Sequence, residues 1–122
     1  MFVFRDENTF WTKARIYDPT ENGRKVAKEI EVEYRVMPPE FVTEQAEKAL
    51  RARTQGEICD DTASLLMEVV SGWKSIKTES KDGPDFEFSD ENLKKLIAIP
   101  YVRSAMIDAY FEGVSGKARK GN

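Results

Sequence analysis

The sequence predicts an α+β protein of one domain, in which an N-terminal antiparallel β-hairpin or small sheet packs against three or four short α-helices. Near the N-terminus, two segments of alternating apolar and polar residues flank a turn, whereas most later apolar segments have helical spacing. The 122 residues, of which 40% are hydrophobic and 34% charged, suffice for one modest core under a charged surface. We expect the domain to span residues 1–116 and a flexible basic tail to span residues 117–122.

The hairpin is predicted by the segments "TFWTKARIYD" and "KVAKEIEVEYRV", which the turn-forming residues of "DPTENG" separate. Alternation directs Lys13 and Arg15 to one face, where they can meet Glu29, Glu31 or Glu33 across the strands. We interpret the acidic row as a solvated sheet face, because carboxylates two residues apart on a strand diverge rather than converge on one metal ion. The opposite face is expected to hold Phe10, Thr12, Ala14 and Ile16 from the first segment and Val26, Ile30, Val32, Tyr34 and Val36 from the second.

Two helices are expected after the hairpin. The residues "MPP" end the second strand and open a helix within "EFVTEQAEKALRART", and "QGEICDD" is the break that follows. Asp60 or Asp61 is expected to cap the second helix, "TASLLMEVVSGW". Gly72, in the left-handed conformation, and Trp73, folded back onto the last turn as a plug of the core, are expected to end it.

A polar loop and two further helices complete the predicted fold. The segment "KSIKTESKDGPDFEF" predicts a loop that is exposed for most of its length, with a short extended piece at "FEF". Ser89 is expected to cap the next helix, with Phe88 and Leu93 at the spacing of a hydrophobic staple. Pro100 interrupts this helix and starts the last one, which is expected to end at Gly113 and Gly116. The buried stripe of the last helix is predicted to hold Val102, Ala105, Met106 and Ala109, with Tyr110 beside it.

The composition disfavours several classes of function. The net charge of −3 does not favour nucleic acid, and no apolar run is long enough to span a membrane. Because the chain has no histidine and only one cysteine, Cys59, histidine-based zinc sites and an internal disulfide are excluded within one chain. No glycine-rich phosphate-binding motif occurs, and the carboxylates of "CDD" and "SDEN" are interpreted as helix caps. We therefore predict no catalytic residue, no cofactor and no bound metal, and a reducing cytoplasm as the location.

The last helix also predicts a surface for another protein. Tyr101, Tyr110 and Phe111 cannot all face inward together with the buried stripe, because Phe111 lies well away from Met106 around a helix. An exposed aromatic residue beside a methionine is typical of a protein-binding patch. Cover of these side chains by the N-terminal sheet is the alternative, and the sequence leaves it open. The candidate partner-binding residues are Tyr101, Met106, Tyr110 and Phe111.

The order of motifs in the second half of the chain resembles the tail assembly chaperones of long-tailed, lambda-like bacteriophages. The pattern runs through "SGWKSIK", "DGPDFEFS" and "ENLKKLIAIPYVRSAMIDAYFEGVSG", and it covers roughly residues 71–116. It consists of a Gly-Trp pair, a D-G turn, an F-S-x-E-N-L helix start and a final helix that begins at proline. The resemblance implies a protein without enzymatic activity. Such chaperones bind the tape measure protein in the host cytoplasm, keep it soluble until the tail tube polymerises, and are absent from the finished particle.

The resemblance also implies a second partner, the tail tube protein. In many such phages a programmed frameshift makes a longer form, whose extension recruits tube subunits. The residues at 115–117 and 119–121 permit a −1 slip, because they can be encoded with "G GGA AAG" and "A AAG GGG" respectively. Self-association is a further option that the sequence leaves open.

Two alternatives from other classes stay open. One is a structural minor tail or connector protein retained in the virion, which its presence in purified particles would reveal. The other is a small enzyme based on carboxylates, which needs a deep pocket with two close carboxylates of displaced pKa. A tape measure gene directly downstream would favour the chaperone.

Overall fold

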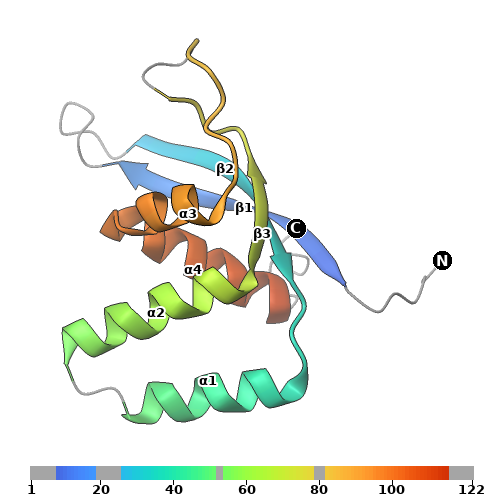
Figure 1. Ribbon diagram of the computed structural model, residues 1–122, viewed down its shortest axis with the longest axis vertical. Coiled ribbons are helices and arrows are strands. Elements are labelled where there is room, and N and C mark those ends of the chain that lie inside the picture. The colour runs from blue at the N-terminus through green and yellow to red at the C-terminus, as the bar shows by residue number, and fades with distance from the viewer. Residues whose placement is uncertain (1–7, 19–25, 52–53, 79–81, 116–122) are drawn as a thin grey trace.

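A three-stranded antiparallel sheet and four helices confirm the predicted α+β fold (Figure 1). The computed structural model describes residues 8–18, 26–51, 54–78 and 82–115. Most of the predicted hairpin turn, Gly116 and the predicted tail therefore lie outside the described residues. The strands are β1 (Thr9–Asp18), β2 (Val26–Arg35) and β3 (Val70–Lys74), in the spatial order β1-β2-β3. The helices are α1 (Pro39–Arg51), α2 (Gln55–Val69), α3 (Asp90–Ile97) and α4 (Pro100–Ser115).

The helices cover one face of the sheet and leave the other to solvent. Helix α4 packs along β1, α2 lies against α3 and α4, and α1 lies beside α2 on the side away from the sheet (Figure 1). The predicted alternation is confirmed, because Ala14, Ile30 and Val32 are buried on the covered face. On the open face Arg15 lies opposite Glu29, and their charged groups are 3.8 Å apart. The acidic row is thus a solvated sheet face that partners basic residues of β1.

Helix α2 begins earlier than the sequence pattern predicts. Its first residue is Gln55, and the hydroxyl of Thr54 accepts a hydrogen bond from the backbone N–H of Glu57 at 3.1 Å. The prediction that Asp60 or Asp61 caps this helix is wrong, because both residues lie inside it. Thr54 and Glu57 have the spacing of a capping box, and this local signal outweighs the glycine between them.

Helix α2 also ends earlier than predicted, because residues 70–74 form a strand. Trp73 pairs with Val32 and Gly72 with Glu33 across the antiparallel β2–β3 ladder. The prediction that Gly72 adopts a left-handed conformation is wrong, since it has extended partners and no positive φ. The edge of β2 supplies unpaired backbone groups, and these stabilise a strand where the local pattern alone favours one more helical turn.

Trp73 is buried as predicted, at 8% exposure, but the loop after β3 covers it rather than the end of α2. The indole N–H donates to the carbonyl oxygen of Phe86 at 2.5 Å, and the ring of Phe86 stacks on the indole at 5.7 Å. Phe88 meets the indole edge-on at 5.1 Å. The loop holds this position through backbone pairing, because Phe86 N–H donates to the Ile76 carbonyl oxygen at 2.8 Å.

The start of α3 agrees with the prediction. The hydroxyl of Ser89 accepts from the backbone N–H of Asn92 at 3.0 Å, which makes Ser89 the N-cap. Leu93 is fully buried and Phe88 packs against the same core, as expected for the two ends of a hydrophobic staple. This cap fixes the angle at which the chain leaves the loop.

Helix α4 starts at Pro100 as predicted and presents its apolar stripe to the sheet. Val102, Met106 and Ala109 are buried there. The expectation that Gly113 ends the helix is wrong, because α4 continues through it to Ser115. A Cβ at position 113 would lie 2.4 Å from the ring of Phe10, so the glycine provides room for an aromatic residue of β1.

Candidate protein-binding groove

An apolar groove opens between α1, α2 and α4, and we call it the three-helix groove. It consists of two adjoining hollows of about 290 and 320 Å³, each near the lower end of the usual range for ligand pockets. Gln45, Leu65 and Phe111 border both hollows. The first hollow is completed by Lys48, Ile58, Asp61, Thr62 and Ile107, and the second by Phe41, Ala46, Tyr110 and Val114.

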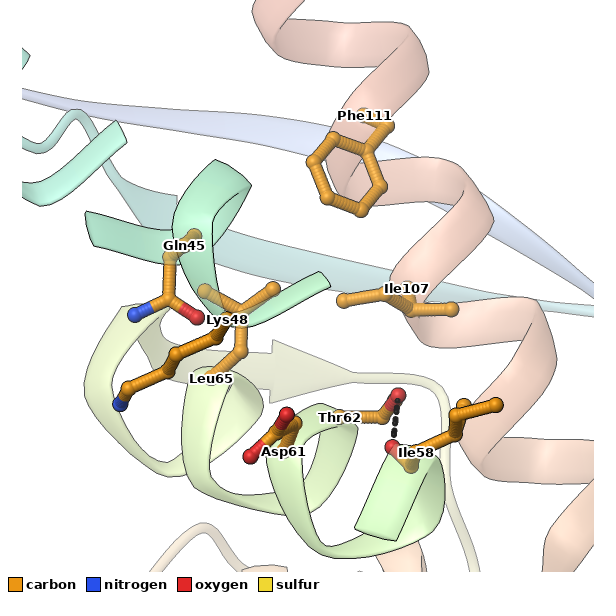
Figure 2. A pocket seen from close by; sticks show the side chains of 8 residues that line it. All are labelled: Gln45, Lys48, Ile58, Asp61, Thr62, Leu65, Ile107 and Phe111. Atoms are coloured by element: carbon orange, nitrogen blue, oxygen red, sulfur yellow. Dashed lines mark hydrogen bonds between the residues drawn. The ribbon is translucent and has the colours of Figure 1, made fainter. Parts of the chain in front are cut away.

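Helix α4 supplies the groove with apolar side chains from outside its core stripe. Ile107, Phe111 and Val114 follow one another at spacings of four and three residues, so they lie on one helix face. Phe111 is 54% exposed and Val114 is 49% exposed. Figure 2 shows Phe111 and Ile107 facing the first hollow from the same side. Two apolar faces on one helix explain why α4 shows more apolar residues than the sheet can cover.

Helices α1 and α2 supply the floor and the opposite wall. Leu65 is 5% exposed and forms the floor where the two hollows meet, and Ile58 is 45% exposed at the far end of the first hollow. Phe41 packs against the core from α1, whereas Leu50, at the other end of α1, is 79% exposed. Helix α1 thus covers α2 only in part, and the groove is the apolar surface that this partial cover leaves open.

The polar groups of the groove gather on the wall that α1 and α2 form. Figure 2 shows Gln45, Lys48 and Asp61 across the hollow from the side chains of α4. The ammonium of Lys48 lies 3.7 Å from the carboxylate of Glu44 on its own helix. The hydroxyl of Thr62 donates to the carbonyl oxygen of Ile58 at 2.9 Å, so it is satisfied within α2. Asp61 is half-buried, and within the described part of the chain no cation lies at ion-pair distance from its carboxylate.

The four predicted partner-binding residues occupy different places. Phe111 lies in the groove, and Tyr110, which is 3% exposed, lines the second hollow with an almost fully buried side chain. Met106 is fully buried, so it is a core residue and offers no surface to a partner. Tyr101 is half-buried and lies ten residues before Phe111, about 15 Å along the helix axis, so it does not line the groove. Of the four predicted residues, the candidate surface thus keeps Phe111 with the buried Tyr110 beside it, and it extends to residues of α1 and α2 that the sequence did not identify.

Buried aromatic residues hold the groove wall in place. The ring of Tyr110 lies 5.3 Å from that of Phe111 and 5.5 Å from that of Tyr34, measured between centroids. The hydroxyl of Tyr34 donates to the carbonyl oxygen of Met106 at 2.6 Å, which joins β2 to the backbone of α4. Burial raises the pKa of both tyrosines, so both hydroxyls stay neutral at ordinary pH.

Two further observations on the described residues concern membranes and metal ions. None of the described helices is both long and apolar enough to cross a membrane. Among the same residues, no three side chains of histidine, cysteine, aspartate or glutamate are grouped so that they could hold a metal ion. The side chain of Cys59 lies outside what the structure describes.

Comparison of the chain with models of known protein families, with curated proteins and with solved structures gave no match.

Proposed function

We propose that this protein is a tail assembly chaperone of a long-tailed bacteriophage, which binds the tape measure protein in the host cytoplasm and keeps it soluble. The observation that carries the proposal is the three-helix groove, which exposes Phe111 and Val114 beside the buried Leu65. Large apolar side chains that line a concave surface are typical of sites that receive a side chain of another protein. The proposal needs no catalytic residue, cofactor or metal.

The size of the groove suits reversible binding. Two hollows admit a few large apolar side chains, each of which contributes about 1.5–3 kcal/mol when it leaves water. Association costs about 4–15 kcal/mol in lost translational and rotational freedom, so one such contact is weak alone. Several copies of the chaperone along one long client would together mask its apolar segments, and the polymerising tube could displace them one at a time.

The resemblance to the chaperone family is a second and separate support for the proposal. Its motifs fall on residues that build the fold: Trp73 is held by the loop, Ser89 caps α3 and Leu93 lies in the core. The segment that carries the pattern also includes Ile107, Phe111 and Val114, which line the groove from α4, whereas the groove residues of α1 and α2 lie outside it.

The second partner that the resemblance implies is the tail tube protein, bound by a longer frameshifted form. We include this form in the proposal, and the DNA sequence tests it directly. Either heptamer at the codons for residues 115–117 or 119–121, followed by an open −1 frame, would support it. If both heptamers or the open frame are missing, the protein makes no extended form by this route.

The proposed function is tested first by looking for a tape measure gene directly downstream of this gene, and then by co-expression of that gene's product with this protein. Phe111→Glu places a charge in the groove and should lower the amount of soluble, co-purified tape measure protein about tenfold, because the charge must lose its water when the client binds. Tyr17→Glu is the matched control, since Tyr17 is a 51% exposed aromatic residue on the open face of the sheet.

Two results would contradict the proposal. If Phe111→Glu and Tyr17→Glu both retain the wild-type yield of soluble tape measure protein, the groove does not bind this client. If purified phage particles contain the protein in stoichiometric amount, it is a structural tail or connector component instead.

A further inference from the structure

We propose that the occupant of the three-helix groove is an amphipathic helix that carries two large apolar side chains about one turn apart and a lysine or arginine that reaches Asp61. The inference rests on the proposed function in one respect, because it takes the groove as the client-binding site. It adds the conformation and the charge of the segment that the groove receives.

The walls of the groove favour a helix over an extended segment. All three walls are helices, whose backbone N–H and C=O groups bond within each helix along most of its length. An extended partner gains affinity mainly by pairing its backbone with a free strand edge, and among the residues that the structure describes no strand residue lines either hollow. A helical partner satisfies its own backbone and needs only side-chain contacts, which is what this groove offers.

The spacing of the hollows sets the apolar pattern of the partner. They lie on either side of Phe111, one toward Ile107 and the other toward Val114, which are four residues before it and three after it. The centres of the hollows are therefore separated by about one helical turn, on the order of 5 Å. Side chains at positions i and i+4 of a partner helix have this separation and would enter one hollow each.

The charges around the groove favour a basic partner. Helices α1, α2 and α4 together carry nine acidic and three basic residues, against a net charge of −3 for the whole chain. At the first hollow, Lys48 is already paired with Glu44, whereas no cation of the described residues is within ion-pair distance of Asp61. A lysine or arginine of the partner would form an ion pair with this half-buried carboxylate, whereas an acidic residue of the partner would be repelled by it.

The test uses fluorescein-labelled, alanine-rich helical peptides with leucines at i and i+4, flanked either by lysines or by glutamates. Fluorescence anisotropy gives the Kd of each peptide for the full-length protein. The lysine peptide should bind about fivefold more tightly than the glutamate peptide, which corresponds to one partly exposed ion pair. Asp61→Asn should weaken the preference for the lysine peptide, and Asp61→Lys should weaken it further. Asp60→Lys is the matched control, because Asp60 is the exposed neighbour with the same charge and does not line the groove.

Several outcomes would overturn the inference. One is an equal effect of substitution at Asp60 and Asp61, and another is no binding by either peptide. A lysine peptide that contains prolines and cannot form a helix should bind at least about fivefold more weakly, and equal binding would exclude a helical occupant. A dimer of the free protein that Phe111→Glu dissociates would assign the groove to a second copy of this chain.

The inference and the proposed function fail separately. If Phe111→Glu abolishes binding of the tape measure protein while the peptides show no charge preference, only the inference is wrong. If the peptides behave as expected while the tape measure protein does not bind, only the proposed function is wrong.

Discussion

Two surfaces of this protein expose large hydrophobic side chains, and they differ in what surrounds those side chains. On the open face of the sheet, Trp11 and Tyr17 are 45% and 51% exposed, and Lys13 and Arg15 lie between them along β1. In the three-helix groove, Phe111 is 54% exposed, and its neighbours around the two hollows are mostly apolar. Exposure of single residues is thus the same on both surfaces, and only their arrangement distinguishes them.

The arrangement decides what a partner would have to desolvate. The ammonium of Lys74 lies 4.3 Å from the ring centre of Trp11, so a partner at this ring must also displace a charged group. Any flat contact with the sheet face would cover charged side chains beside each aromatic residue. A side chain that enters the second hollow meets Phe41, Leu65 and Val114 instead and displaces little more than water. We infer that the sheet face keeps the protein dissolved, whereas the groove receives the partner.

The largest effect is expected at the contact that joins the two regions, where Phe10 of β1 fits against Gly113 of α4. Gly113→Ala places a Cβ 2.4 Å from the Phe10 ring, which Tyr34 and Tyr110 hold at 5.5 and 6.4 Å between centroids. Overpacking costs about 1–3 kcal/mol, and the better helix propensity of alanine offsets up to about 1 kcal/mol of this. We expect a net loss of about 1–2 kcal/mol in the free energy of unfolding, measured by urea denaturation.

A second background separates the steric clash from other effects of this substitution. In Phe10→Leu, which removes the ring carbons Cε2 and Cζ that the new Cβ would meet, Gly113→Ala should cost less than it does in the wild type. The same loss in both backgrounds would show that the ring contact does not limit position 113. Phe10 and Gly113 would then not be the contact that links the sheet to the groove.

A smaller effect on the free energy of unfolding is expected at Tyr34, whose hydroxyl links β2 to the backbone of α4 by a hydrogen bond. Tyr34→Phe removes the 2.6 Å hydrogen bond to the carbonyl oxygen of Met106 and should cost about 0.5–1.5 kcal/mol. Burial also raises the pKa of Tyr34 above its ordinary value of 10. The hydroxyl of Tyr34 therefore ionises at a lower pH in the unfolded chain than in the folded protein. The free energy of unfolding that Tyr34 contributes is fully present below pH 10 and decreases as the pH rises above 10.

Urea denaturation between about pH 8 and about pH 11 checks this pH dependence. The wild type should lose stability over the upper part of the range, and Tyr34→Phe should lose less. Some loss should remain in the variant, because burial raises the pKa of Tyr110 in the same direction. An identical slope in both proteins would show that the hydroxyl of Tyr34 is not protected from ionisation.

The parts of the fold that the sequence predicts correctly have short-range causes. Alternation within β1 and β2 identifies both faces of the hairpin, and Ser89 with its downstream Leu93 identifies the start of α3. The start of α2 had a usable local signal as well, since Thr54 and Glu57 form the first half of a capping box. That signal is masked in the sequence by the glycine at 56, which suggests a break.

The parts that the sequence does not predict depend on distant partners. Residues 70–74 become β3 because the edge of β2, more than thirty residues earlier, is free to pair with them. Phe111 stands out in the sequence because the helical period removes it from the buried stripe of α4. Phe41 and Ile58 could not be assigned to the groove, since the helical periods of α1 and α2 do not reveal how far α1 covers α2. Met106 shows the converse error, because a methionine suits a binding surface by type but lies in the core by position.

The smallest effect is expected on the sheet face, at the pair Arg15 and Glu29. Their charged groups are 3.8 Å apart, and the two side chains are 63% and 47% exposed, so water and salt screen the attraction. A double-mutant cycle with Arg15→Ala and Glu29→Ala should give a coupling free energy of less than about 0.5 kcal/mol between the two side chains. This coupling should be smaller still in about 1 M salt. Tape measure binding should be unchanged in all three variants, because a solvated ion pair on this face takes no part in the groove.

A coupling above about 1 kcal/mol, or a loss of client binding from either single variant, would mean that the sheet face is more than a solubilising surface. The division of roles between the two surfaces would then be wrong, even if Phe111→Glu behaved as expected.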